Sequence, residues 1–229
     1  MSATVQLTAQ DGGQCPAYVA YPADKARGVV IVLQEIFGVN SHIRSVADGF
    51  AQQGYLAVAP HTFHRVRHDV ELGYGPDDIA QGRELKAAVE ALPAPGPMAD
   101  IAAAIMFGAG TTGGKVAIVG YCWGGLLVWR SACSLRGLSA AIAYYGGGMT
   151  SAQEAQRQSL CPVMCHFGEQ DHAIPIDSVK AFALAQPKVE VFTYAAQHGF
   201  NCDQRAAYDA AAAQSAQERT LAFLDRHIG

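Results

Sequence analysis

Short apolar runs alternate with segments of helical character along this chain, and that alternation limits its possible folds more than any other feature. Six runs are predicted as strands: Gly28–Leu33, Tyr55–Ala59, Val116–Val119, Ala140–Tyr144, Val163–Phe167 and Val189–Tyr194. Continuous apolar runs of this length are typical of strands that are buried on both faces of a parallel sheet. The sequence therefore predicts an α/β fold with a mostly parallel central sheet and helices on both faces.

Helices are expected between these strands, and one antiparallel hairpin is expected before them. The predicted helices are Ser41–Gln53 (with Ser41 as N-cap), Asp77–Leu92, Met98–Phe107, Gly124–Leu135, Asp177–Leu184 and Arg205–Ile228. The N-terminal hairpin joins Val5–Leu7 to Ala17–Tyr21 through a glycine-containing turn. No composition shift marks a boundary, so we expect a single domain over residues 1–229.

Composition excludes several classes of protein. Apolar residues make up 50% of the chain, charged residues 16%, and the net charge is −4, so we expect neither intrinsic disorder nor a basic nucleic-acid-binding surface. No run approaches the roughly 20 apolar residues that span a bilayer, and no secretory signal is recognised at the N-terminus. The 6 cysteines include no Cys-x-x-Cys pair, so we expect a reduced, cytoplasmic protein.

The sharpest local feature is a cysteine framed by glycines at the end of a predicted strand. The segment Gly120-Tyr121-Cys122-Trp123-Gly124 follows the strand Val116–Val119 and opens a helix. It has the form G-x-nucleophile-x-G, in which a tight turn strains the backbone of the nucleophile and the glycines leave room for it. The start of a helix also favours a thiolate or an oxyanion. We therefore predict that Cys122 is a nucleophile; a buried structural cysteine is the alternative.

An acid and a base follow the tight turn at Cys122, here called the elbow, in the order that an α/β-hydrolase requires. Asp171 lies in the loop after the fifth predicted strand, and His198 follows the sixth. In this fold the chain order is nucleophile, acid, base, and the loops after parallel strands meet at one edge of the sheet. We predict a triad of Cys122, Asp171 and His198. Two neighbours are rivals: His172 for the base and Glu169 for the acid.

A cluster of histidines precedes the elbow. His61, His64 and His68 suggest a metal site, but their spacing matches neither a zinc finger nor a zincin motif. Arg65 and Arg67 lie between them and would repel a cation. We predict that this segment is a loop lining the cleft and that it binds no metal.

These residues together resemble the dienelactone hydrolase (carboxymethylenebutenolidase) family of the α/β-hydrolase superfamily. The resemblance covers nearly the whole chain. A cysteine elbow combined with Gln-Glu-Ile-Phe-Gly is a specific pairing, since most esterases of this fold carry serine at the elbow. The matching segments are Gln34-Glu35-Ile36-Phe37-Gly38, Gly120-Tyr121-Cys122-Trp123-Gly124-Gly125, Tyr144-Tyr145-Gly146, the Asp171 loop and His198-Gly199-Phe200.

The resemblance implies roles for residues beside the triad. Glu35 would help to hold the resting thiol protonated by like-charge repulsion and then take part in thiolate formation once substrate binds. The backbone N–H groups of Ile36 and Trp123 would form the oxyanion hole. The implied reaction is hydrolysis of an enol-lactone, in which Cys122 forms a thioester and His198 then activates water. A dienelactone would give maleylacetate, in the degradation of chloroaromatic compounds, without a metal or organic cofactor.

The family's substrate carries a carboxylate that arginines hold, and here the resemblance is incomplete. Arg83, on a predicted helix, resembles one of these arginines; a solvated surface arginine is the alternative. The other is expected four residues after the catalytic histidine, where this chain has Cys202, and Arg205 follows three residues later. We expect Phe37 and Tyr145 to line the pocket.

Two alternatives to a carboxylated enol-lactone hydrolase remain open. A carboxylesterase or thioesterase would use the same triad on another substrate. A non-hydrolytic thiol sensor or ligand-binding relative would use Cys122 and would have no need of His198 and Asp171. Turnover of an ester distinguishes the hydrolases from the sensor. We expect a small-molecule substrate, no nucleic-acid or membrane partner, and a monomer.

Overall fold

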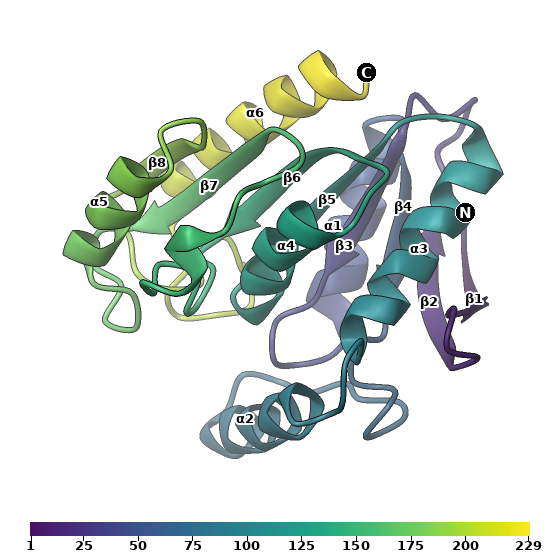
Figure 1. The fold of residues 1–229 in the computed structure, drawn as a ribbon, viewed down its shortest axis with the longest axis horizontal. Coiled ribbons are helices and arrows are strands. Elements are labelled where there is room, and N and C mark those ends of the chain that lie inside the picture. The colour runs from purple at the N-terminus through teal and green to yellow at the C-terminus, as the bar shows by residue number, and fades with distance from the viewer.

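Parallel strands form the centre of the sheet, and an antiparallel pair extends it at one edge (Figure 1). The computed structural model describes residues 1–229, and the strand order is β1-β2-β4-β3-β5-β6-β7-β8. β1 and β2 form the predicted hairpin, β2 is antiparallel to β4, and β4 to β8 pair in parallel with β3 among them. The predicted fold class is therefore confirmed. The strands are β1 Ser2–Thr8, β2 Gln14–Ala20, β3 Val29–Leu33, β4 Leu56–Pro60, β5 Val116–Tyr121, β6 Leu138–Tyr144, β7 Val163–Gly168 and β8 Glu190–Tyr194.

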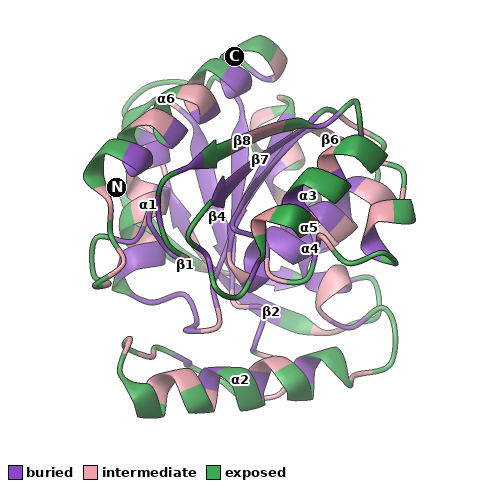
Figure 2. Cartoon of the chain, turned by 90° about the vertical axis from the view of Figure 1, so that its left-hand side faces the viewer, coloured by how far each residue is buried: buried purple, intermediate pink, exposed green.

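Helices cover both faces of the sheet, as predicted. On one face lie α1 (Ser41–Gln52) and α6 (Ala210–His227), and on the other lie α3 (Pro97–Thr112), α4 (Trp123–Ser134) and α5 (Ile176–Ala185) (Figure 2). A short 3₁₀ helix, η1, spans Glu154–Gln156. None of the helices combines the length and the apolar character needed to span a bilayer.

Side-chain caps correct two predicted helix starts. Asn40, not Ser41, caps α1, because its side chain accepts a backbone N–H of the first turn. Asp209 caps α6 in the same way. Arg205 therefore lies in the loop before α6, not in the first turn of a helix.

The third helix of the chain is longer than predicted. The pattern ended it at Phe107, whereas α3 continues to Thr112 through two glycines that normally weaken a helix. Gly108 has a packing reason to be there: a Cβ atom at this position would lie 2.5 Å from Cγ1 of Val29. Glycine thus lets α3 pack closely against β3.

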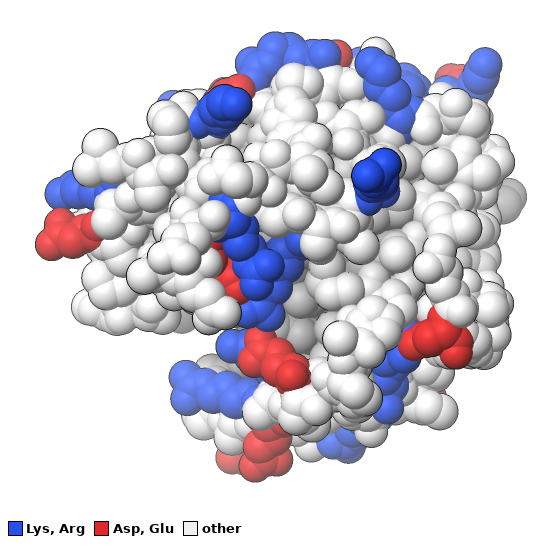
Figure 3. Space-filling view, viewed as in Figure 1, with Lys and Arg blue, Asp and Glu red and all other residues white.

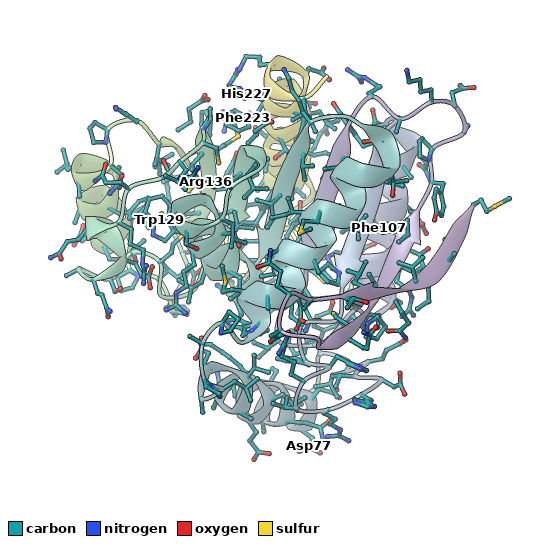
Figure 4. The ribbon with its side chains drawn as sticks, turned by 45° about the vertical axis from the view of Figure 1, so that its right-hand side comes forward. Asp77, Phe107, Trp129, Arg136, Phe223 and His227 are labelled. Carbon is teal, nitrogen blue, oxygen red and sulfur yellow. The ribbon has the colours of Figure 1, made fainter.

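The carboxyl ends of the parallel strands meet at one edge, and α2 (Pro76–Glu90) lies beyond that edge, apart from the sheet (Figure 1). Its small residue Gly82 faces the backbone carbonyl of Ile36, and Glu90 accepts a hydrogen bond from the indole of Trp123 at 3.1 Å. Asp77, at the start of α2, is far from His227 at the end of α6 (Figure 4). A notch separates α2 from the body of the protein, with basic and acidic side chains beside it (Figure 3).

Candidate active site

Cys122 occupies a strained turn between β5 and α4. Its backbone angles are φ 54° and ψ −117°, a conformation that residues with a side chain rarely adopt, and its side chain is half-buried. Glycine is required two residues later, because a Cβ atom at Gly124 would lie 2.5 Å from the carbonyl oxygen of Gln34. Gly120 likewise has no room for a side chain, since a Cβ there would meet the carbonyl of Gly124. The glycines therefore allow the elbow to form directly beside the loop that follows β3.

His198 and Asp171 meet at the same edge of the sheet. Nδ1 of His198 lies 2.6 Å from Oδ2 of Asp171. The other oxygen of Asp171 accepts two backbone N–H groups, from Ala173 at 2.8 Å and from Ile174 at 3.1 Å. The carboxylate is 1% exposed, so its position is fixed and it in turn orients the imidazole. The two rivals, His172 and Glu169, are exposed, and no hydrogen bond joins either of them to His198 or Cys122.

The electrostatic surroundings of His198 favour its protonated form. Burial lowers the pKa of the imidazole, but hydrogen bonding to Asp171 and to the side chain of Cys122 outweighs burial, and the pKa rises to about 10. The imidazole therefore lies between a carboxylate and a thiol, as an imidazole that exchanges protons with a sulfur nucleophile must. The structure thus brings Cys122, His198 and Asp171 together.

Glu35 is buried beside the elbow and forms an ion pair with Arg205. Oε1 of Glu35 lies 3.0 Å from Nη1 of Arg205, and the two side chains are 1% and 19% exposed. The second carboxylate oxygen, Oε2, is buried without a hydrogen-bond partner. Burial lowers the pKa of Arg205, but the neighbouring Glu35 and Cys122 side chains raise it by more than burial lowers it, so the net shift is upward. Gly199 permits this approach, because a Cβ atom there would lie 2.7 Å from Cζ of Arg205.

Sequence reasoning left the position of Arg205 open. The arginine reaches the site from the loop between β8 and α6, and its partner Glu35 is 170 residues away in the sequence. The one available signal was its place shortly after His198, where the family's second substrate arginine is expected. The segment was predicted as the start of a helix, and that prediction gave no reason to expect Arg205 beside Glu35.

Two backbone N–H groups lie next to the elbow with no protein acceptor assigned to them. Trp123 is the first residue of α4, so its N–H has no partner within the helix. Ile36 lies in the turn after β3 and donates no backbone hydrogen bond. The indole of Trp123 is held in place by Glu90 and by the ring of Phe63, whose centroid is 5.1 Å away.

Aromatic side chains form the walls around the Glu35–Arg205 pair. Phe37 is buried against Tyr74, with ring centroids 4.6 Å apart, and the guanidinium of Arg205 lies 5.8 Å from each of these rings. Tyr145 lies 5.1 Å from His198, and its hydroxyl is buried without a partner. Burial and the carboxylate of Glu35 hold the pKa of Tyr145 well above its ordinary value. Both predicted pocket residues therefore lie beside the site.

No hydrogen bond or salt bridge joins Arg83, on α2, to the residues of the site. It is exposed on α2, where it shares a helix row with Lys86 and Glu90 at i+3 and i+7. The carboxylate of Glu90 on that row contacts the indole of Trp123. The row that carries Arg83 therefore continues towards the elbow.

One set of side chains could hold a metal ion: Glu35, His42 and Cys202, each of which offers a ligand atom within 4.8 Å of the others. His61, His64 and His68 do not belong to it. His64 and His68 stack on each other with ring centroids 4.0 Å apart.

Comparisons of the sequence with known proteins point to one family. A model of the dienelactone hydrolase family matches residues 15–228. The carboxymethylenebutenolidase of Pseudomonas putida is 32% identical, with 96% of this chain and 94% of that protein covered. A protein of Synechocystis sp. that is provisionally given the same name is 34% identical, with 90% of this chain and 89% of the relative covered.

Solved structures give the same result for the fold. A Klebsiella pneumoniae protein provisionally described as a dienelactone hydrolase superposes with a TM-score of 0.82 at 31% identity, and 99% of each chain is covered. A dienelactone hydrolase-like promiscuous phosphotriesterase from metagenomic libraries superposes with a TM-score of 0.78 at 21% identity, with 100% and 99% covered. At that lower identity the likeness concerns the fold alone.

Proposed function

This chain belongs to the dienelactone hydrolase family and is a hydrolase, and from that premise we propose that it opens a small, carboxylated enol-lactone through Cys122, His198 and Asp171. The observation that carries the proposal is the 2.6 Å contact between His198 and Asp171 beside the strained elbow of Cys122. A structural cysteine in a turn would need neither the positive φ nor an oriented imidazole.

The reaction proceeds in two halves. The sulfur of Cys122 attacks the lactone carbonyl carbon, and the carbonyl oxygen takes negative charge against the N–H groups of Ile36 and Trp123. The ring C–O bond then breaks, the enol oxygen takes the proton of the His198 imidazolium, and a thioester and a neutral imidazole remain. In the second half, the neutral imidazole of His198 accepts a proton from water, and the hydroxide attacks the thioester and releases the free acid. The thiolate of Cys122 then regains its proton. Asp171 orients the imidazole and stabilises its charged form throughout.

The Glu35–Arg205 pair links substrate binding to formation of the nucleophile. A substrate carboxylate that enters the pocket competes with Glu35 for the guanidinium of Arg205. Once released, the carboxylate of Glu35 accepts the proton of the Cys122 thiol. Arg205 would thus replace the arginine that the family carries where this chain has Cys202. The support for this exchange is the single 3.0 Å contact between the two side chains, which leaves one oxygen of Glu35 unpaired.

A second candidate uses the same residues on an uncharged carboxylic ester or thioester. Its support is that Arg205 is already neutralised by Glu35 at 3.0 Å. A neutral substrate would not need to break that ion pair, and Cys122 would then depend on His198 for deprotonation.

Steady-state hydrolysis of a dienelactone and of a neutral aryl ester, by the wild type and by Cys122→Ala, tests the proposal. We expect a higher kcat/KM for the dienelactone and loss of turnover in the variant. Full activity of Cys122→Ala would contradict the mechanism. Turnover of the neutral ester alone would favour the second candidate. Turnover of neither substrate would contradict both and favour a thiol sensor.

A further inference from the structure

A second group of reactive side chains includes Glu35 and a histidine that the mechanism does not use. His42, on α1, is buried, and so are its neighbours Glu35 and Cys202. One ligand atom from each of the three residues lies within 4.8 Å of the other two. An imidazole nitrogen, a thiol and a carboxylate oxygen therefore converge at one point of the interior.

Two atoms of this cluster have no hydrogen-bond partner. They are Nε2 of His42 and Oε2 of Glu35, and both are buried. A buried polar atom without a partner destabilises the folded state, so its presence in a folded protein needs an explanation. A bound cation would satisfy both atoms at once, because each offers an electron pair and neither has to donate a proton.

The other nitrogen of His42 is arranged as it is in metal sites. Nδ1 lies 3.2 Å from Oδ1 of Asp203. A histidine that binds a metal nearly always directs its second nitrogen to a carboxylate or carbonyl, which fixes the tautomer and makes the ligating nitrogen more basic. Asp203 therefore leaves Nε2 as the free ligand of His42.

From this geometry we infer that Glu35, His42 and Cys202 form a buried binding site for a thiophilic divalent cation such as Zn²⁺, and that the bound ion inhibits the hydrolase by holding Glu35. The inhibitory part rests on the proposed role of Glu35; the binding site does not. Thiolate, imidazole and carboxylate are the ligands of Zn²⁺, whereas Mg²⁺ and Ca²⁺ prefer oxygen ligands only. Three protein ligands leave a fourth, open position for water.

The charges of the cluster balance a divalent ion despite the nearby arginine. Arg205 lies 3.0 Å from Glu35 and opposes a cation. The thiolate of Cys202 and the carboxylates of Glu35 and Asp203 supply three negative charges, which offset those of the arginine and the ion. The coordinating form of Cys202 is the thiolate, so binding releases the thiol proton to solvent.

A cavity reaches one residue of the cluster, His42, from outside. It has a volume of about 380 Å³, lies between α1 and α6, and has His42 and Asp203 in its wall. The side chain of Asp203 is 66% exposed, whereas that of His42 is 4% exposed. The cavity therefore reaches the imidazole from the side of Asp203, whereas Nε2 of His42 is buried on the other side.

Titration of Cys122→Ala with Co²⁺ tests the site directly. The substitution removes the catalytic thiol, so a thiolate-to-cobalt charge-transfer band must arise from another cysteine. We expect the band to saturate at one equivalent of Co²⁺ and to disappear when Cys202→Ser is added. Addition of Cys161→Ser, at a half-buried cysteine outside the cluster, leaves it unchanged. Absence of the band, or its persistence with Cys202→Ser, would overturn the proposed site.

Asp203→Asn provides a second test in an exposed position, where loss of the fold is not expected. Outer partners of metal ligands contribute about 10- to 100-fold to affinity, so we expect Co²⁺ to bind Cys122→Ala/Asp203→Asn about tenfold more weakly. An unchanged affinity would show that His42 is not a ligand.

Inhibition is measured separately, with the catalytic cysteine present. We expect Zn²⁺ to inhibit wild-type ester hydrolysis, and Cys202→Ser to need at least about tenfold more Zn²⁺ for half-inhibition relative to its own uninhibited rate. Equal sensitivity would mean that Zn²⁺ acts at Cys122 and His198 instead. If the cobalt band depends on Cys202 but inhibition does not, the binding site is supported and inhibition through Glu35 is contradicted.

Discussion

Two histidines at neighbouring strands, His166 buried and His198 half-buried, differ in what surrounds their rings. His166, in β7, lies 2.9 Å from the hydroxyl of Tyr194 and 3.1 Å from Oγ1 of Thr220, and it has no carboxylate partner. Burial, with a smaller effect of Arg219, lowers its pKa to about 3. His198 follows β8, and there the carboxylate of Asp171 and the sulfur of Cys122 outweigh burial and raise the pKa to about 10.

The comparison shows that burial alone does not produce a catalytic base. Both imidazoles are at least partly shielded from water, which disfavours the charged form in each. Only the histidine at the carboxyl edge of the sheet meets a carboxylate and a nucleophile. The strand holds His166 in the core as a neutral, hydrogen-bonded packing residue, whereas the loop after β8 gives His198 a partner on each side.

The largest expected effect concerns activity. His198→Ala should lower kcat by about 10⁴-fold, because the imidazole that transfers protons in both halves of the reaction is lost. His166→Gln should retain most of the activity, and His172→Ala, at the exposed rival position, should stay within about twofold of the wild type. Steady-state kinetics on one ester compare all three variants. A large loss in His172→Ala with none in His198→Ala would reverse the assignment of the base.

A smaller loss of activity is expected from the carboxylate. Asp171→Asn keeps the shape of the side chain but removes the charge that orients and stabilises the imidazolium, and we expect kcat to fall by about 10³-fold. Glu169→Gln is the matched control, since Glu169 is exposed and accepts a hydrogen bond from Thr193 at 2.7 Å instead. Equal losses in the two variants would mean that charge near the site, and not contact with His198, is what matters.

The parts of this site that the sequence predicted depend on local rules. Apolar runs located the strands, glycines marked the elbow at Cys122, and the order of the chain placed Asp171 and His198 after later strands. The position of Arg205 depends instead on how a loop folds back against a partner 170 residues away, and no local pattern records that. His42 was missed for the same reason, because it belongs to an ordinary amphipathic helix until Asp203 and Cys202 are brought beside it.

The two histidines also predict opposite effects of pH on stability. His166 is neutral in the folded protein and protonates near its ordinary value of 6.5 in the unfolded chain, so the unfolded state binds more protons. Stability should therefore fall as the pH drops from 6.5 towards 3, with a limiting slope of about 1.4 kcal/mol per pH unit. His198 holds its proton in the folded state, so its contribution is lost as the pH rises from 6.5 towards 10.

Urea unfolding between pH 4 and pH 9 separates the two contributions. His166→Gln should flatten the acid side and leave the alkaline side unchanged, and His198→Ala should do the reverse. His172→Gln, at an exposed position, should alter neither side. An acid side that is unchanged in His166→Gln would mean that His166 is already protonated in the folded protein.

The smallest expected effect extends the comparison from histidines to arginines. Arg205 is held by a buried carboxylate, whereas Arg83 is exposed on α2, so only Arg205 is tied to the nucleophile through Glu35. If Arg83 binds the substrate carboxylate, Arg83→Ala should raise KM for a carboxylated lactone about tenfold, the typical contribution of one charge-assisted hydrogen bond. The kcat should stay nearly constant, and kinetics on a neutral ester should not change. Equal losses on both substrates would assign Arg83 to the packing of α2. Arg205→Lys provides the contrast. It should lower kcat as well, because a lysine lacks the planar pair of donors that binds first Glu35 and then the substrate carboxylate in its place.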